Sequence, residues 1–457
     1  MKRRDFIIGT AAMVAAAGTG GILRAATKDT TDTTDATDTT ESTDTQNTPD
    51  TAAEEPGGPL IASAPMLQNF AETSIGIAFA VSALSSGYVI YGQKADLSDG
   101  KKVKCGGFRV TEVTDRVSQV RLTGLKPATT YYYKIGADRI QYEGGYKMKN
   151  LGSEEDPAIY SFTTAGAKAK AHFCVINDTH VKWPAVERLQ EKILSIGPSC
   201  VIWNGDASNT EETIEAQMRI FIRPEGGPKD YAARIPYLLC PGNHDFRGWA
   251  NRHLERVWMF RQPEERPARD WDLGRNFAVR LGELALIGLD TGEDKMDTNP
   301  RFAGIFNMDA YRKAQAVWLR DALKRKEIAS APFKVAFCHI PLFDPRPDAN
   351  PGDIAPDDSD PRYKTDYAAW QRTCAGLWMP ILTKAGCRLV ITGHQHNYRR
   401  DDPDGSRKWT QLVGGGPKLA DTGYPTLIEG RVEGRELRIT VHNMTTGAIQ
   451  DSIVIKR

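Results

Sequence analysis

The apolar residues of this 457-residue chain follow two different patterns, and the change between them divides the sequence. From about Leu60 to Gly166 the apolar runs are short, and clusters of Gly, Asp, Ser and Pro separate them, as in SIGIAFAVSA, SGYVIYG, SQVRLTGL, TYYYKIGA and AIYSFTT. Such runs between turn residues are typical of β-strands. Because helical periodicity is not visible there, we predict a small all-β sandwich over residues 59–166.

One turn in this region is informative about the type of sandwich. The segment from Leu125 to Tyr131 reads LKPATTY, a Pro-containing turn that leads into a predicted strand. The Tyr131 hydroxyl is expected to hydrogen-bond back to the upstream backbone, as in the tyrosine corner of β-sandwiches. The region therefore resembles a fibronectin type III domain; some other small sandwich is the alternative.

From residue 168 to residue 457, strand-like and helical runs alternate, which is the pattern of an α/β domain. A first helix is predicted over Pro184–Ile196, where three aliphatic residues share one face and Gly197 follows as a stop signal. Six apolar runs are predicted strands: HFCVI, CVIW, YLLC, LALIGL, FKVAFC and RLVIT. A second helix is predicted with Asp309 as its cap and with a buried face made of Ala314, Trp318, Leu319 and Leu323.

The N-terminal residues belong to neither pattern. Residues 1–26 start with a basic cluster that includes Arg3 and Arg4 and continue through a weakly apolar Ala/Gly stretch. Paired arginines followed by Phe6 resemble a twin-arginine export signal, and an ordinary secretory signal is the alternative. Residues 27–58 are mostly Thr, Asp, Ala and Glu, so we predict a disordered linker. We expect an exported protein, in the periplasm, at the cell surface or secreted.

Composition narrows the class of protein. Lys and Arg total 59 and Asp and Glu total 58, so there is no basic field of the kind that nucleic-acid binders use. No apolar run beyond the N-terminal segment is long enough for a membrane-spanning helix, which excludes a transporter or channel. Four of the seven cysteines lie in apolar runs and are predicted to be core thiols, with a disulfide framework as the alternative: Cys174, Cys200, Cys240 and Cys338.

Asp, Asn and His follow five of the predicted strands. In open α/β sheets, ligands bind beyond the carboxyl ends of the strands. Each motif alone is explained as well by a polar turn whose Asn or Asp bonds its own backbone; five in succession are not. In chain order the motifs are Asn177-Asp178-Thr179-His180, Asn204-Gly205-Asp206-Ala207-Ser208-Asn209, Pro241-Gly242-Asn243-His244-Asp245, His339-Ile340-Pro341 and Gly393-His394-Gln395-His396.

These side chains are metal ligands by type. Carboxylate oxygens, imidazole nitrogens and the amide oxygen of Asn243 suit Fe, Mn or Zn. Their number exceeds what one ion needs and is about right for two. We therefore predict a site for two divalent or mixed-valence metal ions where the strands end.

The five motifs in this order resemble those of the calcineurin-like metallophosphoesterase superfamily, over about residues 170–400. The segment with Gln315, Trp318 and Leu319 resembles another stretch of that family. The resemblance implies a four-layer αββα sandwich preceded here by the small all-β domain. It assigns metal one to Asp178, His180, Asp206 and His396, and metal two to Asp206, Asn243, His339 and His394.

The resemblance also implies a mechanism. A hydroxide between the ions attacks phosphorus in line, with Asp206 bridging the two ions. His244 serves as the general acid that protonates the leaving oxygen, and Asp245 is expected to orient its imidazole. The chain is thereby predicted to be a metal-dependent phosphoesterase that acts on a small-molecule phosphoester.

A small β-domain before a metallophosphoesterase domain resembles the architecture of purple acid phosphatases. The sequence departs from that family at two positions, because His180 stands where the family has Gly and Asn209 stands where it has a metal-binding Tyr. Without a tyrosinate ligand we expect no purple colour. Neither a ferric ion nor an acidic pH optimum therefore follows from the resemblance.

Two classes of function are open from the sequence. An exported hydrolase is favoured, acting on phosphomonoesters or, alternatively, on phosphodiesters or nucleotides at the same site. The other class is a surface-tethered binding protein with an inert metal domain, against which the intact ligand set argues. We expect neither sequence-specific nucleic-acid binding nor a transmembrane domain beyond the signal segment. Arg247, Arg399 and Arg400 are candidate contacts for phosphate or a second substrate group, with ordinary surface arginines as the alternative. The Pro- and Asp-rich stretch Asp344–Asp366 is predicted to form a lid or rim or, alternatively, a mobile solvated loop.

Overall fold

A computed structural model of the protein describes residues 58–105, 113–260, 273–299, 304–345, 366–405 and 407–457. The predicted signal segment lies outside these ranges, as does the predicted linker apart from its last residue. Residues 346–365, most of the predicted rim stretch, also lie outside them.

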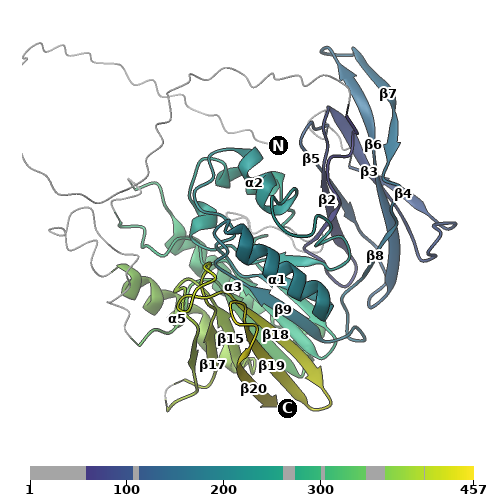
Figure 1. Ribbon diagram of the computed structural model, residues 1–457. Helices are drawn as coiled ribbons and strands as arrows, with labels where there is room; N and C mark the ends of the chain where they lie inside the picture. The colour runs from purple at the N-terminus through teal and green to yellow at the C-terminus, as the bar shows by residue number, and fades with distance from the viewer. Residues whose placement is uncertain (1–57, 106–112, 261–272, 300–303, 346–365, 406) are drawn as a thin grey trace, which may run out of the picture. The chain divides into compact units, whose positions relative to one another are not determined.

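Three β-sheets form the framework (Figure 1). The nine-stranded sheet has the order β20 (Ile449–Lys456), β19 (Glu436–Asn443), β18 (Thr426–Glu433), β9 (His172–Ile176), β10 (Cys200–Trp203), β11 (Tyr237–Leu239), β1 (Met66–Gln68), β2 (Ile75–Ala80) and β5 (Val117–Leu122). The six-stranded sheet has the order β12 (Phe277–Leu281), β13 (Leu284–Leu289), β14 (Phe333–Cys338), β15 (Leu389–Thr392), β17 (Thr410–Val413) and β16 (Arg399–Asp401). The five-stranded sheet has the order β4 (Lys101–Lys104), β3 (Ser85–Gly92), β6 (Thr130–Tyr142) and β7 (Met148–Glu155), with β8 (Tyr160–Thr163) paired to β6.

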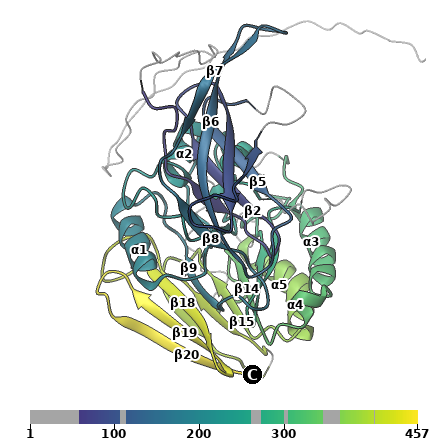
Figure 2. The same ribbon diagram turned by 90° about the vertical axis from the view of Figure 1, so that its right-hand side faces the viewer.

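The two larger sheets face each other and are covered by helices on their outer faces (Figure 2). Phe173 of β9 and Phe337 of β14 meet edge to face between the sheets, with ring centroids 5.7 Å apart. The helices α1 (Trp183–Ile196) and α2 (Ile214–Phe221) pack on the nine-stranded sheet. On the six-stranded sheet lie α3 (Met308–Ala322), α4 (Lys326–Ala329) and α5 (Asp366–Lys384). The predicted four-layer αββα sandwich is confirmed.

The six predicted strands of this sandwich are all present, as β9, β10, β11, β13, β14 and β15. Five of them, β9, β10, β11, β13 and β15, are buried along their whole length, because each sheet is covered on both faces. In the described part of the chain all seven cysteines are free, and the four predicted core thiols are buried. None of the described helices combines the length and the apolar content needed to cross a membrane.

The N-terminal β-domain shares a sheet with the αββα sandwich. Its strands β1, β2 and β5 extend the nine-stranded sheet, since Gln68 of β1 pairs in parallel with Tyr237 of β11. The Gln68 side chain donates to the carbonyl of Val257 at 2.9 Å, and the Tyr133 hydroxyl donates to the carbonyl of Ala233 at 2.7 Å. The two predicted segments thus belong to one compact unit with a continuous core.

Local sequence signals predicted the end of helix α1 correctly but not the cap of helix α3. Helix α1 ends where predicted, because Gly197 adopts φ 63° and its N–H bonds the carbonyl of Ile193. Helix α3 begins at Met308 and not with Asp309 as its cap. The carboxylate of Asp297 accepts the N–H groups of Met308 and Asp309, at 2.7 and 3.0 Å, so a distant acid serves the helix start. Asp309 instead pairs with Arg312.

The predicted tyrosine corner is present. The Tyr131 hydroxyl accepts the N–H of Lys126 at 2.9 Å. We predict that Tyr131→Phe lowers the free energy of unfolding by about 0.5–1.5 kcal/mol, because the N–H loses its partner. Denaturant titration measures this change, with Tyr132→Phe as the control, since Tyr132 points to the opposite face of β6. Equal stability of the two variants would contradict the assignment.

Candidate metal centre

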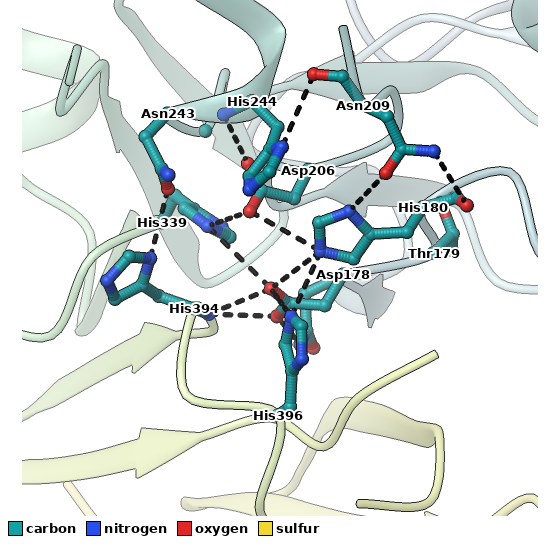
Figure 3. Close-up of polar contacts among 12 residues, drawn as sticks. Asp178, Thr179, His180, Asp206, Asn209, Asn243, His244, His339, His394 and His396 are labelled. Carbon is teal, nitrogen blue, oxygen red and sulfur yellow. Dashed lines mark hydrogen bonds and ion pairs between the residues drawn. The ribbon is translucent and has the colours of Figure 1, made fainter. Parts of the chain in front are cut away.

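The five polar motifs converge because the strands that precede them end at one edge of the two facing sheets. β9, β10 and β11 run parallel in one sheet, and β14 and β15 run parallel in the other. The side chains that follow these strands point toward one another in Figure 3. The structure thus brings together all seven predicted ligands: Asp178, His180, Asp206, Asn243, His339, His394 and His396.

Asn204 fastens the two sheets at this edge. Its side-chain amide donates to the carbonyls of Cys338 and Ile391, at 3.2 and 3.1 Å, at the ends of β14 and β15. Its own carbonyl accepts a hydrogen bond from Nδ1 of His339, at 2.9 Å. The buried Asn204, which directly follows β10, therefore holds the two sheets together and orients the imidazole of His339.

The ligand residues have strained backbones. Of the nine non-glycine residues with positive φ in the described part of the chain, five are predicted ligands: Asp178, His180, Asp206, His394 and His396. Each such conformation costs about 1–3 kcal/mol and persists where the surroundings over-determine it. Gly242 shows how crowded these surroundings are, because an added Cβ would lie 2.6 Å from the backbone nitrogen of Asp206.

The donor atoms form three overlapping groups, each with ligand atoms within 4.8 Å of one another. The first contains Asp178, His180 and His396, and the second contains Asp206, His339 and His394. Asp206 is also grouped with His180 and His244, so its carboxylate lies near donors of both predicted ligand sets. Asn243 joins the second set, since its Oδ1 lies 3.0 Å from Nδ1 of His394. The residues present fit two ions of the Fe, Mn or Zn type.

Hydrogen bonds fix which nitrogen of two imidazoles faces the centre. Nδ1 of His180 bonds Oδ1 of Asn209 at 2.9 Å, and the Asn209 amide donates to the carbonyl of His180 at 3.2 Å. Nδ1 of His339 is held by Asn204 as described above. In both residues Nε2 is left to face the aspartates, at 3.6 Å for His180 and 3.0 Å for His339 from Oδ2 of Asp206.

Charge balance in the centre depends on buried acids. Burial opposes ionisation of Asp206, but the positive imidazole of His339 and its hydrogen bond hold the pKa of that carboxyl well below its usual range. Burial likewise disfavours the charged form of His339, yet Asp206 and Asp178 raise its pKa to about 10. Imidazolium thus compensates the carboxylates here, a role that metal cations take over when they bind.

His244 lies beside the ligands and contacts an arginine. Its Nε2 accepts a hydrogen bond from Arg247 at 3.1 Å, and its backbone N–H donates to Oδ1 of Asp206 at 2.9 Å. Burial and the Arg247 charge lower the His244 pKa to about 4, although Asp206 opposes this. Arg247 in turn makes two hydrogen bonds to the buried carboxylate of Glu293, at 2.9 and 2.7 Å.

The expected role of Asp245 was wrong. Its carboxylate accepts the backbone N–H groups of Gly242, Asp206 and Ser208, at 2.9 to 3.1 Å, and the Ser208 hydroxyl at 2.8 Å. The 3-10 turn η2 (His244–Phe246) directs Asp245 inward, where these donors compensate its burial. Asp245 therefore holds the loops after β10 and β11 together, and the side chains that contact the His244 imidazole include Arg247 and His180.

The other two candidate arginines are paired with acids. Arg399 contacts Asp401 at 3.0 Å and Asp344 at 3.8 Å, and Arg400 contacts Asp402 at 2.7 Å. Among the three candidate arginines, Arg247 is thus the one with a contact to the centre.

A sixth strand is also followed by buried polar residues, and the sequence prediction missed it. β13 (the LALIGL run) is followed by Asp290, Glu293, Asp294 and Lys295, all of them buried. Glu293 holds Arg247, and Asp294 lies near His394. The rule that found the five motifs, a buried strand followed by polar residues, would have found this one as well.

Residues 171–398 match the family model of the calcineurin-like phosphoesterases, and the protein belongs to this family. The predicted superfamily is thereby confirmed. Among curated proteins, none matches the sequence.

Solved structures with the same fold include two phosphatase-like proteins. The purple acid phosphatase PPD1 from seeds of yellow lupin (Lupinus luteus) aligns with 86% of this chain and 75% of its own, at 15% identity and a TM-score of 0.58. PhoD aligns with 88% of this chain and 90% of its own, at 13% identity and a TM-score of 0.58. Coverage of this size reaches beyond residues 171–398 into the N-terminal β-domain.

We predict that Asp206→Asn binds fewer than two equivalents of metal, because the bridging position loses its charge. His253→Ala is the control, since His253 lies in η3 (Asn251–Arg256), outside the ligand groups, and should leave metal content unchanged. Elemental analysis of the purified proteins measures both. Two equivalents retained by Asp206→Asn would overturn the bridging assignment.

Proposed function

We propose that the protein hydrolyses small-molecule phosphoesters, preferably monoesters, with two metal ions bound where the strands end. The observation that carries this proposal is the set of three overlapping donor groups, in which Asp206 lies near donors of both predicted ligand sets. An inert metal domain has no need of buried carboxylates, strained ligand residues and oriented imidazoles at one point. These features support an enzyme over a binding protein.

When bound, the two ions polarise a phosphoryl oxygen and lower the pKa of water at the site. The chain's own residues prepare that chemistry. Asp178 and Asp206 remain ionised, and His180 and His339 present Nε2 as a lone pair once deprotonated. The His396 side chain is 43% exposed, so substrate approaches the centre from that side.

His244 and Arg247 would serve the leaving group. His244 is neutral in the described state because its pKa is about 4. A bound phosphoester dianion places negative charge beside the imidazole and raises its pKa. We expect His244 to gain a proton with substrate in place and to give it to the leaving oxygen.

Arg247 keeps its positive charge throughout this cycle. Its bidentate pairing with Glu293 holds the guanidinium against His244, where it can hydrogen-bond a phosphoryl oxygen. A dianionic monoester gains more from this charge than a monoanionic diester does, which is why we favour monoesters.

The function is tested with a panel of phosphomonoesters and phosphodiesters and with protein loaded with Mn, Zn or Fe in turn. We expect metal-dependent hydrolysis that is faster for monoesters. Faster diester hydrolysis would contradict the substrate class, and no hydrolysis with any of these metals would contradict the function.

A second experiment isolates His244. We predict that His244→Ala lowers kcat by about 10²–10⁴-fold for alkyl phosphates, whose leaving oxygen needs a proton. The loss should be smaller for nitrophenyl phosphate, because its leaving group is stable as an anion. Metal content should stay at two equivalents. The same loss for both substrates would argue against proton transfer by His244.

We propose further that the protein is exported after folding. The support comes from Arg3 and Arg4 in the N-terminal segment, which lies outside the described residues. Insertion of the metals before export would avoid competition from tighter-binding divalent metals outside the cell. Arg3→Lys combined with Arg4→Lys keeps the charge and should prevent export of metal-loaded protein. Normal amounts outside the cell, assayed by fractionation, would speak against this route.

A further inference from the structure

The buried loop after β13 reaches the metal centre from a direction that none of the five motifs uses. Glu293 and Asp294 are 0% and 2% exposed. The first of them holds Arg247, as described above. The second faces His394, a ligand predicted for metal two.

Asp294 lies between a cation and the imidazole of His394. One of its oxygens, Oδ1, contacts Nζ of Lys295 at 2.5 Å. The other, Oδ2, lies 3.6 Å from Nε2 of His394. Both side chains of the Asp294–Lys295 pair are 2% exposed, so this ion pair directs an acceptor oxygen toward His394.

The two ring nitrogens of His394 face different groups. Nδ1 lies 3.0 Å from Oδ1 of Asn243, inside the metal-two group. Nε2 is buried, and among the described residues it has no hydrogen-bond partner. The ring also stacks on Tyr367, with centroids 5.7 Å apart and planes at 22°. A small shift of His394 or Asp294 brings Nε2 within hydrogen-bond distance of Oδ2.

We propose that Asp294 is a positioning residue for metal two, which accepts a hydrogen bond from Nε2–H of His394 and so leaves the Nδ1 lone pair directed at the metal. This inference rests on the proposed two-metal centre. A carboxylate in this role fixes the tautomer of the imidazole and raises its basicity as a ligand. Lys295 compensates the charge of the buried Asp294 carboxylate.

The first test measures metal binding to the full-length protein after its metals have been removed. Titration with Mn or Zn should show two equivalents for the wild type. Asp294→Asn should weaken the second equivalent by about 10–100-fold and leave the first unchanged. Asp290→Asn is the matched control, because it changes a buried acid of the same loop that bonds the N–H of Gly292 and the hydroxyl of Tyr311, and both equivalents should bind as in the wild type.

Asp294→Asn removes the negative charge of a buried ion pair with Lys295 and can impair folding. The double variant Asp294→Leu with Lys295→Met removes both charges, and it should show the same selective loss of the second equivalent. Wild-type affinity for both equivalents in a folded variant, or an equal loss at both sites, would overturn the proposal.

The second test observes the imidazole in the protein loaded with Zn, because without metal Nδ1 can donate to Oδ1 of Asn243. In the Zn-loaded wild type labelled with ¹⁵N-histidine, the His394 signals, assigned with His394→Gln, should show the proton on Nε2. A proton on Nδ1 would overturn the proposal. If the wild type binds no metal pair, the proposed function itself fails; if it binds two ions and the Asp294 variants do as well, this inference alone fails.

Discussion

Two buried aspartates at the ends of adjacent parallel strands are the constraint on which the site depends. Asp178 follows β9 and Asp206 follows β10, and pairing of Ile176 with Trp203 brings the two strand ends side by side. Two carboxylates in such a position repel each other, and burial raises the cost of their charge. The imidazole of His339 lies 3.0 Å from one and 3.7 Å from the other and compensates them. Metal cations provide the same compensation more fully, so the acids specify a cation site.

Holding these groups together takes support from residues that are not ligands. Asn204 ties the two sheets together, and Asp245 ties three backbone N–H groups of two loops. Asn209 hydrogen-bonds both the imidazole ring and the backbone carbonyl of His180. His180 and Asn209, the two residues at which the sequence departs from purple acid phosphatases, are therefore in contact, and the Asn209 amide supports the His180 imidazole. That pair stands where the other family uses a tyrosinate ligand.

The sequence predicted what depends on local pattern and order. Buried strands, the glycine stop at Gly197, the Tyr131 corner and the convergence of the seven candidate ligands all follow from short motifs. The predictions failed where the hydrogen-bond partner of a side chain is far away in the sequence, or where the outcome depends on the direction in which a side chain points. Asp245 turns inward because of a 3-10 turn, and Asp297 serves the helix start from eleven residues away. The N-terminal β-domain and the αββα sandwich share one sheet because β1 pairs with β11. No local sequence pattern reveals this pairing.

The central claim is that the strand ends hold two ions bridged by Asp206. A crystal structure with anomalous diffraction recorded at the absorption edges of Mn, Fe and Zn tests it most directly. The account predicts two anomalous peaks about 3.5–4 Å apart, with Asp206 between them, the first near His180 and His396 and the second near His339 and His394. A single peak, or two peaks that do not share Asp206, would contradict it.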